Sequence, residues 1–310
     1  MTIEDIGRKL DGLGLWDAVG PYHWAIKPKG TAFPYFFCLL KGEQAPVKVR
    51  LLLLEGWQTF HDFVRTRIDR NYAFYLSPIE FPHYELVILE SGEMKLFRHD
   101  AGYAPLEADA RQRDFCARLL WEMFGVMMRI ETDRQLPLKF ATEKAIFARV
   151  ETAPDVWSDE PLVIPDPRAH VERVVFKKDD IAAAKDLPFA AEEKIEVDFR
   201  LFPHWVTTEK RPRNAYVLCV LDAATGERLV WDRRTIDPET GLRGMWESLP
   251  PRLLAHIIAR GRVPSEIRLS SGRIFRLLRM LCTEIPFKLS LHDRMPLMDA
   301  AFAAGTEAGS

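Results

Sequence analysis

The chain has 310 residues, of which 47% are hydrophobic and 28% charged, so it holds enough apolar material for buried cores and cannot be wholly disordered. A single core usually stops growing near roughly 250–300 residues, and we therefore expect two domains. The formal net charge of -2 excludes a surface built throughout to neutralise nucleic acid or anionic lipid.

The beginning of the chain carries no sign of export. Charged residues interrupt positions 1–16, which predict a short amphipathic helix rather than a secretory signal. No stretch approaches the roughly 18–20 consecutive apolar residues of a membrane span. Four cysteines lie 63 to 103 residues apart among apolar neighbours, without a CxxC pair, and predict buried, reduced thiols: Cys38, Cys116, Cys219 and Cys282. We expect a cytoplasmic protein without a membrane segment.

Residues 1–150 predict an α+β lobe. Two β-rich runs, 35–40 and 47–54, flank a polar loop with glycine and proline, which indicates a hairpin. The four leucines from Leu51 to Leu54 show no alternation, so this strand should be covered on both faces. A helix over 57–68 and a second hairpin over 85–97 follow. Apolar residues at three- and four-residue steps then predict a long helix over 107–129.

Residues 151–170 are interpreted as a linker between the lobes. The segment contains four prolines and five acidic residues, a composition that disfavours both a helix and a central strand.

Residues 171–305 predict an α/β lobe, followed by a flexible tail at 306–310. A short helix over 179–185 precedes strict alternation from Lys194 to Leu201, which indicates a half-buried strand. The next strand, 216–221, ends in a turn that begins at Asp222 and closes at Gly226. Two further strands, 266–269 and 286–291, alternate with three helices. We expect Ser248 to cap the first helix and Gly261 to end it, Ser270 or Ser271 to cap the second, and the third to span 299–304.

This order of elements predicts a mixed, partly parallel sheet in two or three layers with helices. The fold class is therefore α/β, with an α+β first lobe. Cys38 and Cys219 lie in similar apolar runs, and Glu85 and Glu266 open strand-like runs 181 residues apart, but the intervening helices do not align, so an internal duplication stays open.

The acids of the second lobe suggest one candidate site. The strand that ends in Asp222, the helix with Glu247 and the later acids Asp293 and Asp299 resemble the ribonuclease H architecture in their order. That resemblance implies carboxylates that hold two divalent cations for phosphodiester chemistry. The sequence departs from it at Ser270 and Ser271, where the family needs a carboxylate, and Asp222 also suits the first position of a turn.

An arginine-rich stretch suggests a binding surface. Residues 241–282 contain eight arginines and two glutamates, a local charge of +6. On the helix that begins near residue 272, three arginines are expected opposite the apolar face, and the alternative is that they form an ordinary solvated face. The candidate binding residues, which would meet an acidic protein or a nucleic acid, are Arg268, Arg273, Arg276 and Arg279.

Histidine motifs are interpreted as packing. Phe81-Pro82-His83-Tyr84 and Phe202-Pro203-His204-Trp205 share a pattern, and His23 lies in a similar context, but neither tetrapeptide includes a second ligand. The sequence also has no phosphate loop, HExxH or GxSxG motif. We assign no catalytic residue, no metal ligand and no cofactor.

Two parts of the chain resemble a group of bacterial two-domain proteins of unknown function. They are 98–105 in the first lobe and, in the second, 211–212, 218–226 and the run 261–267, Gly-Arg-Val-Pro-Ser-Glu-Ile. The resemblance implies no activity, because none is established for that group. Our leading hypothesis is a non-enzymatic cytoplasmic binding or interaction protein. The alternative is a nucleic-acid-associated protein with a degenerate ribonuclease-H-like lobe.

Overall fold

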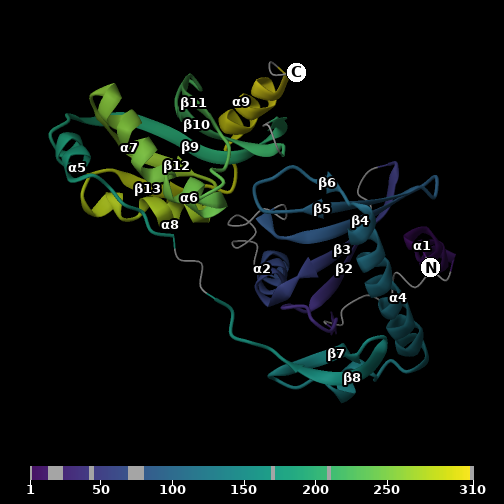
Figure 1. The fold of residues 1–310 in the computed structure, drawn as a ribbon. Helices are drawn as coiled ribbons and strands as arrows, with labels where there is room; N and C mark the ends of the chain where they lie inside the picture. The colour runs from purple at the N-terminus through teal and green to yellow at the C-terminus, as the bar shows by residue number, and fades with distance from the viewer. Residues whose placement is uncertain are drawn as a thin grey trace. The chain divides into compact units, whose positions relative to one another are not determined.

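A computed structural model describes residues 2–12, 24–41, 45–68, 80–168, 172–207 and 211–307. The chain divides into two compact units (Figure 1). The first comprises Met1–Val64, Phe81–Asp100 and Pro105–Ala169, and the second comprises Arg65–Glu80, Ala101–Ala104 and His170–Ser310. Each unit has its own sheet and its own hydrophobic cores.

The first unit is built on an eight-stranded sheet in the order β6-β5-β4-β3-β2-β1-β7-β8. Neighbouring strands are antiparallel, except that β1 and β7 are parallel. The strands are β1 (Trp24–Lys27), β2 (Tyr35–Lys41), β3 (Val47–Glu55), β4 (His83–Leu89), β5 (Met94–His99), β6 (Leu106–Glu107), β7 (Ala145–Ala153) and β8 (Val156–Val163). The helices are α1 (Ile3–Gly12), α2 (Gly56–Ile68), α4 (Ala110–Thr132) and the short 3-10 turn η3 (Pro137–Lys139).

The leucines of β3 pack on both faces of this sheet. Leu51 and Leu53 share a core with apolar residues of α1 and α4, whereas Leu52 and Leu54 share one with aromatic residues of α2. Because successive side chains of a strand point to opposite faces, an uninterrupted apolar run needs cover on both sides. The prediction from the sequence is confirmed.

The long helix α4 begins three residues later than predicted. Asp109 caps it: its Oδ1 accepts a hydrogen bond from the Gln112 backbone N–H at 2.8 Å, and Gln112 Oε1 accepts one from the Asp109 backbone N–H at 3.0 Å. This reciprocal capping box satisfies two amides that have no partner within the helix. The cap therefore fixes the start, which the apolar periodicity could not locate.

The segment predicted as a linker contains strand structure up to Val163. Strand β8 forms an antiparallel hairpin with β7 and lies at the edge of the sheet, where Pro161 is opposite Phe147. An edge strand tolerates proline because one side of its backbone has no partner strand. Residues 151–153 complete β7, which lies between β1 and β8, so the composition correctly disfavoured a helix but foresaw neither this strand end nor the edge strand β8.

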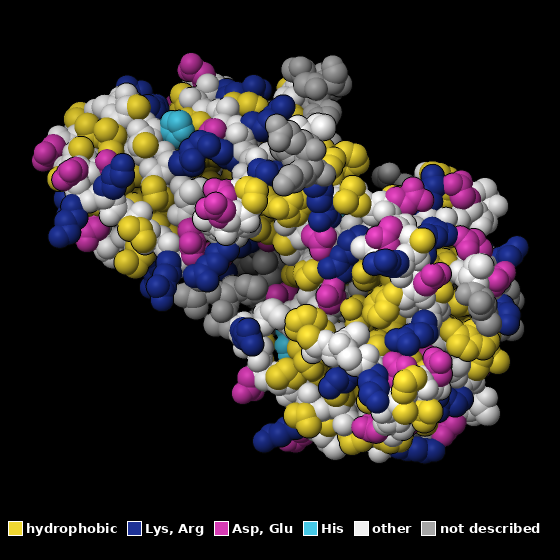
Figure 2. Space-filling view, viewed as in Figure 1, with side chains coloured by type: hydrophobic (Ala, Val, Ile, Leu, Met, Phe, Trp, Pro, Cys, Tyr) yellow, Lys and Arg dark blue, Asp and Glu magenta, His cyan; other side chains and the backbone are white. Residues whose placement is uncertain are grey.

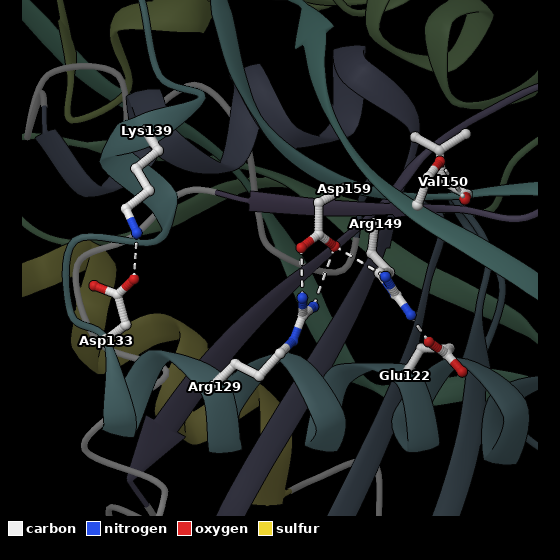
Figure 3. A network of polar contacts seen from close by, with 8 residues as sticks. Glu122, Arg129, Asp133, Lys139, Arg149, Val150 and Asp159 are labelled. Carbon is white, nitrogen blue, oxygen red and sulfur yellow. Dashed lines mark hydrogen bonds and ion pairs between the residues drawn. The ribbon is translucent and has the colours of Figure 1, made fainter.

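Ion pairs attach this hairpin to α4 (Figure 3). Arg129 of α4 pairs with Asp159 of β8, and Arg149 of β7 donates to Asp159 Oδ1 at 3.0 Å and to Glu122 Oε2 at 3.1 Å. Burial alone would raise the pKa of Asp159, but hydrogen bonds and charges from the two arginines lower it overall. The carboxylate therefore joins helix and hairpin in its charged form.

The second unit contains a five-stranded sheet in the order β11-β10-β9-β12-β13. The strands are β9 (Phe189–Val206), β10 (Arg213–Asp222), β11 (Arg228–Arg234), β12 (Val263–Leu269) and β13 (Lys288–Leu291). Strand β10 is antiparallel to both of its neighbours, β9 and β11, whereas β12 runs parallel to both β9 and β13. The α/β class with a mixed, partly parallel sheet is thus confirmed.

Helices lie on both faces of this second sheet (Figure 1). They are α5 (Lys178–Lys185), α6 (Gly241–Glu247), α7 (Leu249–Arg260), α8 (Gly272–Leu278) and α9 (Pro296–Glu307), with a 3-10 turn η4 (Leu281–Thr283). Apolar residues of α7 and α8 pack on one face and those of α9 on the other.

Most of the predicted caps and turns of this unit are present. Asp222 Oδ1 accepts hydrogen bonds from the Ala224 and Thr225 backbones at 2.9 Å, and Gly226 closes the turn with a φ of 74°. Gly261 ends α7 with a φ of 70°, and Ser271 caps α8. Ser248 does not cap α7, because α6 ends immediately before it and its hydroxyl donates to the Met245 carbonyl at 2.7 Å.

Candidate functional site

The central strand β9 presents charged residues on the face that α9 covers. Ile195, Val197 and Phe199 lie in the core beneath α7 and α8. Alternation therefore directs Glu196, Asp198 and Arg200 to the opposite face. We call the group formed by Glu196, Asp198, Arg200, Arg268, Ser270 and Asp299 the α9-side polar cluster.

Asp198 lies at the centre of this cluster. Its carboxylate accepts hydrogen bonds from the Phe199 backbone N–H at 2.8 Å, from Arg200 Nε at 2.6 Å and from Ser270 Oγ at 2.8 Å. The residue is only 2% exposed. A buried carboxylate needs such donors to compensate for lost hydration, and here three are provided.

Arg200 connects Asp198 to α9. Its Nη1 donates to Asp299 Oδ1 at 2.6 Å, while Nε remains on Asp198. The guanidinium carbon lies 4.9 Å from the centre of the Phe302 ring, within the range of a cation–π contact. The positive charge between the two carboxylates is therefore supplied by the protein itself. A divalent cation bound by both acids would have to displace Arg200.

Glu196 is the least compensated acid of the cluster. It is opposite Arg268 in the β9–β12 register and receives a hydrogen bond from the Met298 backbone, but its Oε2 has no hydrogen-bond partner among the described atoms. Burial raises its pKa, and the nearby charges of Arg268 and His292 lower it in part. The raised pKa favours the protonated, uncharged form of the Glu196 carboxyl group.

The cluster continues to the edge strand β13. Glu266 accepts hydrogen bonds from Ser290 Oγ at 2.7 Å and from Arg268 Nε at 3.3 Å, and Lys194 Nζ lies 3.6 Å from it. The Ser290 Oγ atom also lies 3.0 Å from His292 Nε2. The Glu266 carboxylate is thus compensated by two neighbouring cations and a hydroxyl donor.

The region that carries the cluster matches one family model. Residues 180–304 match a domain of unknown function (DUF6930). The matched region runs from within α5 into α9 and includes the whole second sheet. Comparisons with curated proteins and with solved structures gave no match. Within the described ranges, no helix is both long and apolar enough to cross a membrane.

The acids singled out from the sequence have separate contacts within the DUF6930 region. Asp222 serves its turn, and Glu247 accepts hydrogen bonds from the Arg173 backbone at 2.7 Å and from Arg243 at 2.8 Å. Asp293 is exposed. Only Asp299 joins the α9-side polar cluster. Sequence reasoning missed Asp198, because a polar residue in an alternating strand was assumed to face solvent.

The arginines singled out from the sequence also separate. Arg268 belongs to the α9-side polar cluster, whereas Arg276 and Arg279 are exposed at α8 and its C-terminal end. Figure 2 shows basic and acidic side chains interspersed over the visible face of each unit rather than gathered in one basic patch.

Arg273, a candidate binding residue expected opposite the apolar face of its helix, is instead buried. Arg273 is 6% exposed, donates to Glu80 at 2.8 Å and to Glu172 at 2.9 Å, and lies 3.9 Å from the centre of a Trp246 ring. Both acids come from segments of the second unit that are distant in sequence from α8, so helical periodicity alone gave no sign of this cover. Burial raises the pKa of Glu80, although Arg273 lowers it in part.

A pocket of about 320 Å³ lies beside the exposed end of α8. Its walls are mainly apolar, with two charged residues, and are formed by α5 and the segment after α8: Phe176, Lys178, Ile181, Met280, Leu281, Thr283 and Glu284. Met280 is 66% exposed, so its thioether side chain is accessible at the rim of this pocket. Apolar pockets of roughly 300–1,000 Å³ with a few polar groups are typical of ligand sites.

In the motif 202–205, the side chains of Pro203 and His204 lie outside the described residues, as does the whole of His23. The four cysteines form no disulfide among the described residues; Cys116 and Cys219 are buried as predicted, whereas Cys38 and Cys282 are only partly buried. Burial raises the pKa of Cys116 to about 12, which leaves this thiol protonated and unreactive near neutral pH.

Proposed function

We propose that the protein is a non-enzymatic, cytoplasmic binding protein of the bacterial two-domain type, and that its second unit binds an acidic partner at the end of α8. The observation that carries the proposal is the combination of exposed Arg276, Arg279 and Met280 with the adjacent apolar pocket. Arginine and methionine are both enriched in protein interfaces, where one supplies charge and the other adaptable apolar contact.

The internal neutralisation of the α9-side polar cluster supports a non-enzymatic role. Arg200 places a fixed positive charge between Asp198 and Asp299, so these acids are engaged without a metal ion. Ser270 holds the position at the end of β12 where phosphodiester chemistry of the ribonuclease H type would use a carboxylate.

The alternative is a nucleic-acid-associated protein with a degenerate ribonuclease-H-like lobe. A specific observation favours it: three antiparallel strands followed by two parallel ones, in the spatial order third, second, first, fourth, fifth, correspond to that architecture. In this alternative, Arg276 and Arg279 would contact phosphates rather than carboxylates.

Fluorescence anisotropy can distinguish the two proposals. Labelled glutamate-rich peptide, single-stranded DNA and single-stranded RNA are titrated with the full chain at two salt concentrations. We expect the peptide to bind, and the double variant Arg276→Glu/Arg279→Glu to abolish binding. The matched control, Arg228→Glu/Arg294→Glu, changes the same charge at exposed positions of the second unit and should bind normally.

Each outcome decides between the hypotheses. Salt-dependent binding of DNA or RNA that is lost only in the α8 double variant would favour the nucleic-acid alternative. Binding that both double variants weaken equally, or no binding of any probe, would contradict the α8 surface as the site. Hydrolysis of either nucleic acid with Mg²⁺ or Mn²⁺ would contradict the non-enzymatic role.

A further inference from the structure

Three metal-binding side chains meet on one face of the first sheet. His83 and Glu85 are two residues apart on β4 and therefore point to the same face. In the antiparallel register, His83 lies directly opposite His99 of β5. The expectation from the sequence that the motif around His83 includes no second ligand is thus incomplete, because the partner histidine comes from the next strand.

The three side chains are close together and buried. One ligand atom from each lies within 4.8 Å of the other two. His99 Nε2 is 2.7 Å from Glu85 Oε2, and the two imidazole rings stack with their centres 4.3 Å apart. The residues are 3%, 4% and 6% exposed in the order His83, Glu85, His99. Burying polar and charged groups in this way is costly unless they are hydrogen-bonded, paired or bound to a metal ion.

Neighbouring groups orient these side chains in the manner of metal ligands. His83 Nδ1 lies 2.8 Å from the Phe81 carbonyl oxygen. Because a carbonyl can only accept, Nδ1 carries the proton, and Nε2 keeps a free lone pair. Arg50 pairs with Glu85 Oε1, which leaves Oε2 toward the histidines. Metal-ligating histidines usually donate their other ring nitrogen in this way, and ligating carboxylates are themselves hydrogen-bonded.

One atom of the group lacks a proper partner. His99 Nε2 is buried and has no partner with hydrogen-bond geometry among the described atoms, although the Glu85 oxygen is close to it. A buried ring nitrogen in this situation can gain a bond either by protonation or by coordination. Coordination would use the lone pair of this nitrogen together with His83 Nε2 and a Glu85 oxygen, since one ligand atom of each residue lies within 4.8 Å of the others.

We propose that His83 Nε2, Glu85 Oε2 and His99 Nε2 bind one divalent first-row transition metal ion. Two imidazoles and one carboxylate favour ions such as Zn²⁺ or Fe²⁺ over Mg²⁺ and Ca²⁺, which prefer oxygen ligands. Donor atoms around a tetrahedral zinc ion with bonds near 2.1 Å lie about 3.4 Å apart. The three side chains therefore need only small rotations, which separate Glu85 from His99 and splay the stacked rings.

Metal titration of the full chain tests the proposal. The protein is stripped with a chelator and titrated with Zn²⁺ against a chromophoric competitor, and with Co²⁺ followed by its d–d absorption. We expect one ion per chain, a rise in the thermal unfolding temperature with Zn²⁺, and a Co²⁺ spectrum of nitrogen and oxygen ligands without a thiolate charge-transfer band.

Variants then locate the ion. His83→Gln, Glu85→Gln and His99→Gln should each weaken Zn²⁺ binding by at least about tenfold, since even the loss of an outer-shell partner costs that much. The matched control His256→Gln removes a histidine of the second unit and should leave binding unchanged. If a ligand variant fails to fold, the Co²⁺ spectrum and thermal shift of the unaltered chain still decide.

Several results would overturn the proposal. The first is that metal produces no change in the unaltered chain. The second is a thiolate band in the Co²⁺ spectrum, and the third is binding that survives all three glutamine variants. In each case the three residues would be a buried hydrogen-bonded group without a metal. A loss of binding in His256→Gln would equally place the ion elsewhere.

Discussion

Replacing Arg200 by methionine should destabilise the second unit strongly. The Asp198 side chain is 3% exposed and that of Arg200 is 32% exposed, so the substitution leaves a buried carboxylate without its cation. Removing one partner of a buried ion pair typically costs about 3–5 kcal/mol. Asp198 keeps its bonds from the Phe199 amide and Ser270, which places the expected loss near the lower end, about 3 kcal/mol.

Urea unfolding followed by tryptophan fluorescence and circular dichroism measures this loss. Because the protein has two units, the data need a model with two transitions, and Trp231 and Trp246 report on the second. A loss of about 3 kcal/mol corresponds to a fall in Tm of roughly 6–12 °C for a unit of this size. The variant Asp198→Asn/Arg200→Met removes both charges and should recover part of the loss.

Two results would refute this reasoning. A loss below about 0.5 kcal/mol in Arg200→Met would be typical of an exposed position and would mean that Asp198 does not depend on the guanidinium. A double variant no more stable than Arg200→Met would mean that the cost arises from packing against α9 rather than from the orphaned charge.

Three further substitutions test other parts of the structure. The pKa of Asp159 is lowered in the folded state, so its contribution to the free energy of unfolding is present above the unfolded value near 3.8 and is lost as pH falls through the folded pKa. Asp159→Asn should therefore cost about 1–3 kcal/mol at neutral pH. It should also reduce the acid dependence of unfolding in the first unit, which urea unfolding at several pH values measures. At Gly102, where φ is +80°, an added Cβ would lie 2.5 Å from a side-chain carbon, so Gly102→Ala should lower Tm more than Gly30→Ala, where φ is +78° and the space is open. Equal falls in Tm for the two variants in calorimetry would show that the positive φ, and not the space around the added Cβ, sets the loss of stability. Arg273→Ala should cost about 3–5 kcal/mol in urea unfolding because it orphans buried acid, whereas Arg276→Ala should stay within about 0.5 kcal/mol, and similar values would contradict the burial of the former.

Local signals in the sequence predicted local structure well. The leucines of β3, the turn at Asp222 and the helix end at Gly261 follow from side-chain alternation and from the backbone freedom of glycine. Each of these depends on residues close together in the chain. The mixed sheet of the second unit was also predicted, because the order of strands and helices limits the possible crossovers.

The candidate sites depend on contacts that the sequence does not reveal. Asp198 was overlooked because only the packing of α9 shows that the polar side of β9 is covered. The proposed metal ligands required the register of β4 and β5, which brings His99 opposite His83. Arg273 was misjudged because its partners, Glu80 and Glu172, lie 193 and 101 residues away in the sequence.

The second unit is made of three separate segments of the chain, which limits how the protein can be truncated. Residues 65–80 and 101–104 belong to it, although they precede the family match by many positions. Glu80 neutralises Arg273, and the Gly102 carbonyl accepts a hydrogen bond from the Asn214 backbone at 3.0 Å. A fragment cut to the matched residues would therefore leave the buried Arg273 guanidinium without either of its two acids, Glu80 and Glu172, and the Asn214 amide without its acceptor. A recombinant fragment intended to preserve this fold must retain sequence from both sides of residue 100.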